Sequence, residues 1–156
     1  FKNTIIIMTS NLGSQYIQQQ FEHLNDTNRE EVIDKAKVAV MDMLKKTIRP
    51  EFLNRIDETI MFLPLTKEQI GDVVRLQLER VKDMLEPQGI ELQWTDPAIN
   101  YLSDVGYDPE FGARPVKRAI QRYVLNDLSK SLLAGTVNRD KPVIIDSFGE
   151  GLVFRN

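Results

Sequence analysis

The chain has 156 residues, with 20 Lys and Arg against 23 Asp and Glu, one His and no Cys. Its length predicts one domain or two small ones, and its 42% apolar share is typical of globular proteins. The lack of Cys excludes disulfide scaffolds and thiolate zinc sites, and the single His23 excludes a multi-His metal site. The net charge of −3 argues against nucleic-acid binding, and no apolar run reaches the ~18 residues of a membrane span. We therefore expect a cytoplasmic protein with no nucleic-acid or membrane partner.

The first 63 residues have the pattern of an incomplete α/β domain. The β-branched run at 4–9 predicts a strand buried on both faces, and 58–62 predicts a second strand. Between them we expect a short helix and loop at 15–28 and a helix from residue 28 or 29 to 48. Because two parallel strands cannot bury their own faces, we expect residues 1–63 to be the last part of a larger α/β domain.

Residues 64–156 have the pattern of a complete small α+β domain. Thr66 and Gln69 form a predicted capping box, and the apolar stripe behind it predicts a helix that ends near Pro87. Asp96 is the predicted N-cap of the next helix, with Pro97 at its first position. The remaining expected elements are a strand at 90–94, a turn-rich loop at 106–112, a long helix at 114–134 closed by Gly135, and two strands at 142–146 and 152–154.

Asn11 is the first residue with candidate chemistry, because it follows directly after the predicted buried strand. Ligands of open α/β sheets bind at this edge, where an amide can orient a water or a phosphate. The alternative is that Asn11 only tolerates a left-handed conformation and closes a turn.

Two further segments present arginines at defined places. In the segment 49–57, Arg49 and Arg55 flank the apolar pair Phe52-Leu53, which could fix Arg55 at the rim of the domain, where it could reach a neighbouring subunit's phosphate. The alternative is a surface ion pair of Arg55 with Asp57 or Glu51.

Arg114 stands at a predicted helix start, where a cation opposes the helix dipole and so favours an anionic ligand. The alternative is a solvated basic face, made of Arg114, Lys117, Arg118 and Arg122. The chain has no Gly-x-x-x-x-Gly-Lys-Ser/Thr pattern and no pair of acids suited to Mg²⁺ at a strand end.

Three motifs in this order resemble the second nucleotide-binding domain of Clp/Hsp100 AAA+ ATPases. They are the strand ending in Thr9-Ser10-Asn11, the segment Arg49-Pro50-Glu51-Phe52-Leu53-Asn54-Arg55-Ile56-Asp57, and the segment Gly106-Tyr107-Asp108-Pro109-Glu110-Phe111-Gly112-Ala113-Arg114-Pro115. The resemblance spans essentially the whole chain. It implies that residues 1–63 are the C-terminal part of a AAA+ large subdomain, and that residues 64–156 are the small (lid) subdomain.

The resemblance also implies a role for each candidate residue. Asn11 matches sensor 1, which positions the attacking water, and Arg55 matches the arginine finger, which acts in trans on ATP in the adjacent subunit. Arg114 matches the sensor 2 arginine, which contacts the nucleotide in cis, and Arg49 is a further candidate for nucleotide binding. ATP is then the expected nucleotide, with the ligands of its Mg²⁺ and both Walker motifs outside this chain. We therefore expect the parent protein to be an ATPase and the chain alone to be inactive.

Peptidase-linked members of the family carry a Gly-containing docking loop between sensor 1 and the arginine finger. Residues 15–46 contain no Gly, which favours the ClpB-type disaggregases. The resemblance then implies a homo-hexamer, unfolded or aggregated proteins as substrates, an Hsp70-type co-chaperone system and no peptidase partner. The alternatives are a ClpA- or ClpC-type unfoldase, a lid-derived adaptor or scaffold without ATPase activity, and a nucleic-acid-binding module that uses the basic face.

Overall fold

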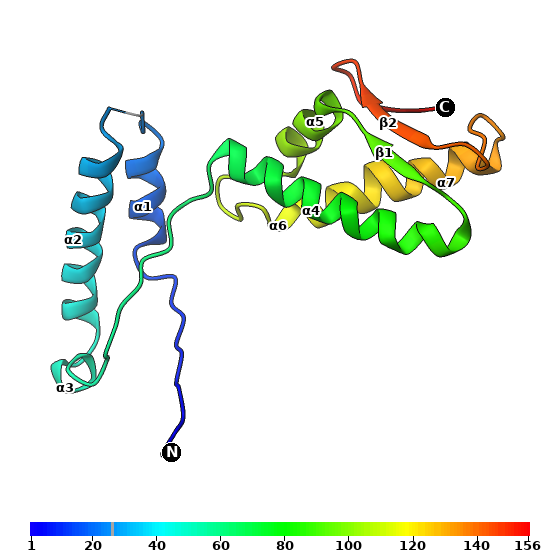
Figure 1. The fold of residues 1–156 in the computed structure, drawn as a ribbon. Helices are drawn as coiled ribbons and strands as arrows, with labels where there is room; N and C mark the ends of the chain where they lie inside the picture. The colour runs from blue at the N-terminus through cyan, green and yellow to red at the C-terminus, as the bar shows by residue number, and fades with distance from the viewer. Residues whose placement is uncertain (26) are drawn as a thin grey trace. The chain divides into compact units, whose positions relative to one another are not determined.

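The computed structural model describes residues 1–25 and 27–156, and these divide into two compact units, Phe1–Pro64 and Leu65–Asn156 (Figure 1). The expected loop within 15–28 includes Asp26, which lies outside the described residues.

In the described residues of the first unit, 1–25 and 27–64, there are three helices. Helix α1 spans Ser14–Phe21, α2 spans Arg29–Thr47 and α3 spans Pro50–Leu53. Figure 1 shows α1 and α2 side by side, and they pack closely at Gly13, where an added Cβ would lie 3.0 Å from Cγ2 of Val40. The short helix expected within 15–28 and the helix expected from residue 28 or 29 to 48 are confirmed.

The two strands expected in this unit are absent from the described residues. The segments 4–9 and 58–62 form no β-ladder, and their apolar side chains are exposed, 83% for Ile7 and 85% for Phe62. The prediction of two strands in this unit is therefore wrong for this structure. The physical reason is that a strand exists only through hydrogen bonds to a neighbour, and neither segment has one.

The second unit has four α-helical segments and a three-stranded sheet. The helices are α4 (Lys67–Leu85), α5 (Asp96–Gly106), α6 (Arg114–Ala119) and α7 (Asn126–Leu133), with a 3₁₀ turn η1 at Glu86–Gln88 and a π-helical turn η2 at Ile120–Leu125. The strands are β1 (Leu92–Trp94), β2 (Val143–Ser147) and β3 (Leu152–Arg155). The sheet order is β1-β2-β3, with β1 parallel to β2 and β3 antiparallel to it.

The capping box at the start of α4 forms as predicted. The backbone N–H of Gln69 donates to the Thr66 hydroxyl at 3.2 Å, and the Thr66 N–H donates to the Gln69 side chain at 2.9 Å. The predicted cap of α5 is wrong by one residue: Thr95, not Asp96, accepts from the Ala98 N–H, at 3.4 Å. Thr95 is held extended because its own N–H donates to the Ile145 carbonyl at 3.0 Å, which ties the cap to the sheet.

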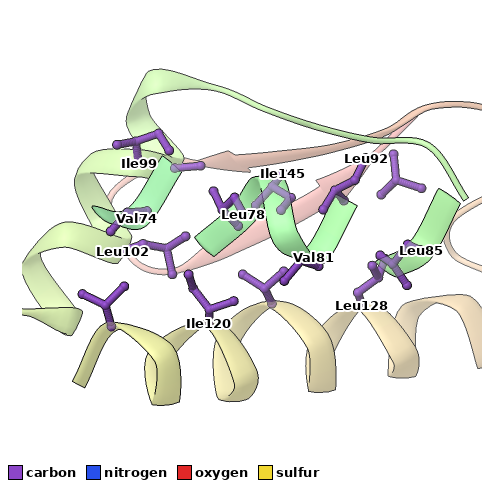
Figure 2. Close-up of a cluster of buried hydrophobic side chains, with 14 of the residues drawn as sticks. Val74, Leu78, Val81, Leu85, Leu92, Ile99, Leu102, Ile120, Leu128 and Ile145 are labelled. Atoms are coloured by element: carbon purple, nitrogen blue, oxygen red, sulfur yellow. The ribbon is translucent and has the colours of Figure 1, made fainter. Parts of the chain in front are cut away.

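One hydrophobic core holds the second unit together. Figure 2 shows side chains of α4, α5, the π-helical turn and α7 meeting those of β1 and β2. The fully buried members with the largest side chains are Ile70, Leu78, Leu92, Ile99, Leu102, Leu128 and Ile145.

The long helix expected at 114–134 contains a π-helical turn in its middle. Val116, Ile120, Val124 and Leu128 are all buried, at uniform steps of four residues. In an α-helix each residue turns about 100°, so three such steps would rotate the buried face by about 120°. The wider turn η2 turns less per residue, so it keeps all four side chains on the core face.

Candidate functional site

Asn11 lies between the extended segment at 4–10 and helix α1. Its backbone carbonyl accepts from Ser14 twice, from the N–H at 3.1 Å and from the hydroxyl at 2.6 Å. Its side chain is exposed and makes no hydrogen bond to any described residue. Among the residues the structure describes, Asn3 is the only non-glycine with a positive φ, so Asn11 is not left-handed. The other part of that alternative is confirmed, because the Asn11 carbonyl closes a turn with the Ser14 N–H.

Arg49 and Arg55 flank the single helical turn α3. The Arg49 carbonyl accepts from the N–H groups of Phe52 and Leu53 at 3.0 and 3.1 Å, and the Arg55 N–H donates to the Phe52 carbonyl at 3.1 Å. The backbone of this segment is therefore a closed turn that holds both arginines at its two ends. The expected apolar anchor is only half formed, because Leu53 is half-buried whereas Phe52 is exposed.

Both arginine side chains are exposed and make no ion pair with any described residue. The alternative of a surface pair between Arg55 and Asp57 or Glu51 is therefore wrong. An exposed guanidinium with no acidic partner presents all of its donors to a ligand or to another subunit.

Arg114 begins helix α6, as predicted, after a tightly closed loop. The loop is closed by two backbone hydrogen bonds between Asp108 and Gly112, of 2.7 and 3.0 Å, and Gly112 has a φ of 63°. Before the loop, Gly106 lies against α6, where an added Cβ would be 3.0 Å from Val116 Cγ2 and 3.1 Å from its Cα. Gly106, by its lack of a Cβ, and Gly112, by its positive φ, therefore let this loop pack tightly.

The basic face of Arg114, Lys117, Arg118 and Arg122 is exposed, as the solvated alternative also requires. None of these four cations forms an ion pair with a described residue. Arg122 lies over the ring of Tyr123, with its guanidinium carbon 5.3 Å from the ring centroid. That contact gives Arg122 a cation–π partner, whereas Arg114 has none.

A buried carboxylate ties the start of α5 to the sheet. Asp146 accepts from the Thr95 hydroxyl at 2.8 Å, from the Ser147 N–H at 2.8 Å and from Arg155 at 3.2 Å. These hydrogen bonds, that of Thr95 foremost, hold the pKa of Asp146 below its ordinary value. Because α5 carries Gly106 at its other end, the network helps to fix the helix against which α6 packs. Sequence reasoning did not find it, since Thr95 and Asp146 are 51 residues apart.

The candidate residues are divided between the units, with Asn11, Arg49 and Arg55 in the first and Arg114 in the second. Sequence reasoning also missed Asp108, although an Asp before Pro in a Gly-bounded loop is a recognisable turn pattern. No group of three or more acidic or His side chains suited to a metal ion occurs among residues 1–25 and 27–156. Over the same residues, no helix combines the length and apolarity that crossing a membrane requires.

Comparison with known proteins gives the same division of the chain. Residues 65–145 match the model of the C-terminal, D2-small domain of ClpB protein, and residues 1–59 match the model of the AAA domain (Cdc48 subfamily). Nearly the whole length of the chain therefore matches domains of AAA-class proteins. A ClpB chaperone of Bacteroides thetaiotaomicron is 68% identical over the whole chain, and that of Porphyromonas gingivalis is 52% identical. The chain belongs to the ClpB family.

A solved structure agrees with this assignment. The S. cerevisiae Hsp104–ADP complex matches 94% of the chain with a TM-score of 0.74 and 30% identity, over 25% of its own chain. The chain spans only 18% of the length of the two ClpB relatives. An expected fold of the AAA+ type is thus confirmed.

Proposed function

We propose that this chain is the C-terminal part of the second AAA+ domain of a ClpB-type, ATP-driven protein disaggregase of the cytoplasm. Residues 1–63 form the end of the large subdomain and residues 64–156 form the small subdomain. The observation that carries the proposal is the 68% identity to a ClpB chaperone over all 156 residues, which include all three motifs.

In the proposed site, ATP lies between two subunits of a homo-hexamer. Asn11 orients the attacking water, and Arg114 contacts the nucleotide of its own subunit. Arg55 reaches the phosphates of the adjacent subunit, with Arg49 assisting. The unpaired state of Arg55 and Arg114 fits this assignment, because a guanidinium free of acidic partners can form two hydrogen bonds to a phosphate.

The phosphate-binding loop and the Mg²⁺ ligands then come from parts of the parent protein outside this chain. Hydrolysis changes the angle between the large and small subdomains around residues 62–65 and so moves the loops that grip a substrate. The substrates are unfolded or aggregated proteins, delivered together with an Hsp70-type co-chaperone system. The lack of Gly in residues 15–46 supports the absence of a peptidase partner.

The test of the shared site is an activity measurement on mixed hexamers of the intact parent protein, with its other nucleotide-binding domain inactivated. Arg55→Ala should reduce ATP turnover by about 10³–10⁵-fold, while a fluorescent ATP analogue still binds. The matched control is Arg29→Ala, which removes another exposed arginine of the same unit and should leave turnover unchanged.

Mixing supplies the decisive comparison. Arg55→Ala subunits are combined in equal amounts with subunits that lack the phosphate-binding lysine, so that neither kind is active alone. If Arg55 acts in trans, roughly one interface in four regains both parts in a random ring, and turnover returns. Mixed rings without turnover would contradict the trans assignment, and normal turnover of Arg55→Ala alone would remove Arg55 from the reaction.

A further inference from the structure

The side chain of Asp108 organises the loop between α5 and α6. Its Oδ1 accepts two backbone hydrogen bonds, from the N–H of Glu110 at 2.7 Å and from the N–H of Phe111 at 3.0 Å. Its own backbone pairs with Gly112 in both directions. Asp108 forms no salt bridge with a described residue, so these loop N–H groups are the partners of its carboxylate.

Hydrogen bonds connect this ordered loop directly to the backbone of Arg114. The Phe111 N–H donates to the Asp108 carboxylate, and the Phe111 carbonyl accepts from the Arg114 N–H at 3.3 Å. On the other side, Val116 rests against Gly106 with no room for a Cβ between them. The first turn of α6 is therefore fixed from two directions, by the loop and by α5.

Nothing in the described structure fixes the Arg114 side chain itself. Its guanidinium is exposed and has neither an acidic partner nor an aromatic ring beneath it, unlike that of Arg122. Only the position of the Arg114 backbone therefore determines where its guanidinium can contact a ligand. That backbone is held by the loop that Asp108 closes.

We propose that Asp108 is a positioning residue, which sets the place and direction of Arg114 for contact with the nucleotide. This inference rests on the function proposed above. Asp108 does not touch the nucleotide and acts only through the chain of hydrogen bonds to Phe111 and Arg114. A shift of about 1 Å in a positioned group can cost up to about 100-fold, so loss of this carboxylate should be measurable.

The test compares four variants in the intact parent protein with its other nucleotide-binding domain inactivated. They are Asp108→Ala, Asp108→Asn, Arg114→Ala and the double variant Asp108→Ala/Arg114→Ala. The affinity for a fluorescent ATP analogue and the kcat and KM of ATP turnover are measured for each. The control is Asp127→Ala, which removes a half-buried aspartate from α7 that pairs only with Lys130 in the described structure.

We expect Asp108→Ala to weaken nucleotide affinity by roughly 3- to 100-fold, and Asp108→Asn to restore most of it, because the amide oxygen can accept the same two N–H bonds. In the Arg114→Ala background, Asp108→Ala should cause no further loss, since its effect acts through Arg114. The control should behave as the unchanged protein, and circular dichroism should show that each variant is folded.

Two different failures are distinguishable. If Arg114→Ala leaves affinity and turnover unchanged, the proposed role of Arg114 is wrong and this inference falls with it. If Arg114→Ala weakens binding but Asp108→Ala does not, or if the two losses add fully in the double variant, the proposed function stands and only the inference is overturned.

Discussion

The close approach of α5 to α6 gives two Gly→Ala substitutions opposite effects. In Gly106→Ala the new Cβ would lie 3.0 Å from Val116 Cγ2 and 3.1 Å from Val116 Cα. The second atom is backbone, so α6 itself must move by a few tenths of an ångström. Overpacking of this kind costs about 1–3 kcal/mol, and the better helix propensity of Ala returns at most about 1 kcal/mol. We expect a net loss of about 1–2 kcal/mol in the free energy of unfolding.

Gly71→Ala is the matched control, because Gly71 is also a buried helical glycine of the same unit. Its new Cβ would meet only side-chain atoms, at 3.6, 3.8 and 3.9 Å, which is ordinary van der Waals contact. The substitution should therefore stabilise the unit by about 0.5–1 kcal/mol through helix propensity.

The assay is urea unfolding of the 156-residue chain, followed by the fluorescence of its single Trp, Trp94, in strand β1. Thermal unfolding of the second unit, Leu65–Asn156, should agree, with a shift of about 4–8 °C per kcal/mol for a domain of fewer than about 100 residues. The argument that α5 and α6 are too close for a Cβ at Gly106 would be refuted by either of two results. One is a Gly106→Ala variant as stable as the unchanged chain, and the other is a change of stability in the same direction for both variants.

Four other outcomes follow from the structure. Thr66→Ala should cost about 1 kcal/mol in the same urea assay, because it removes the N-cap of α4. Leu78→Ala should cost about 2–5 kcal/mol, since the side chain is fully buried, whereas Leu76→Ala on the exposed face of the same helix (54% exposed) should be nearly neutral. The lowered pKa of Asp146 means that its contribution to stability is present above the ordinary aspartate pKa of about 3.9 and is lost as the pH falls through the folded-state pKa, so Asp146→Asn should flatten the acid limb of the stability profile. The chain alone should release no phosphate from ATP in a colorimetric assay, and measurable release would contradict the placement of the phosphate-binding parts elsewhere.

Elements set by local rules could be predicted from the sequence. The capping box of α4 and its apolar stripe, the helix start at Arg114 and the closing Gly135 are all found where the pattern placed them. Each depends on hydrogen bonds or side-chain spacings within a few residues, which the sequence displays directly.

Features that depend on distant partners could not be predicted in the same way. The β-branched run at 4–9 has the composition of a strand, but pairing, not composition, makes a strand, and this segment has no pairing partner. The cap of α5 lies at Thr95 because of a bond to Ile145, fifty residues away. The π-helical turn was not predicted, although the apolar residues Val116, Ile120, Val124 and Leu128 recur at steps of four in the sequence and indicate it.

In the candidate site, the sequence predicted only in part which arginines have no acidic partner. It left open, as the alternative for Arg55, a surface ion pair that does not form, and it left the solvated alternative open for Arg114. The roles of Asn11, Arg49, Arg55 and Arg114 remain predictions, since they concern a ligand and a neighbouring subunit.

The π-helical turn η2 has a consequence for how this fold can change by insertion and deletion. The turn lies between α6, which carries Arg114, and α7, whose side chain Leu128 is buried in the core. One residue more or fewer here would swing one end about the long axis by about 100° relative to the other. Insertion or deletion of one residue here would therefore rotate the Arg114 end of the helix while α7 stayed packed in the core. We expect selection to constrain the length of this turn more strictly than the identity of its exposed residues.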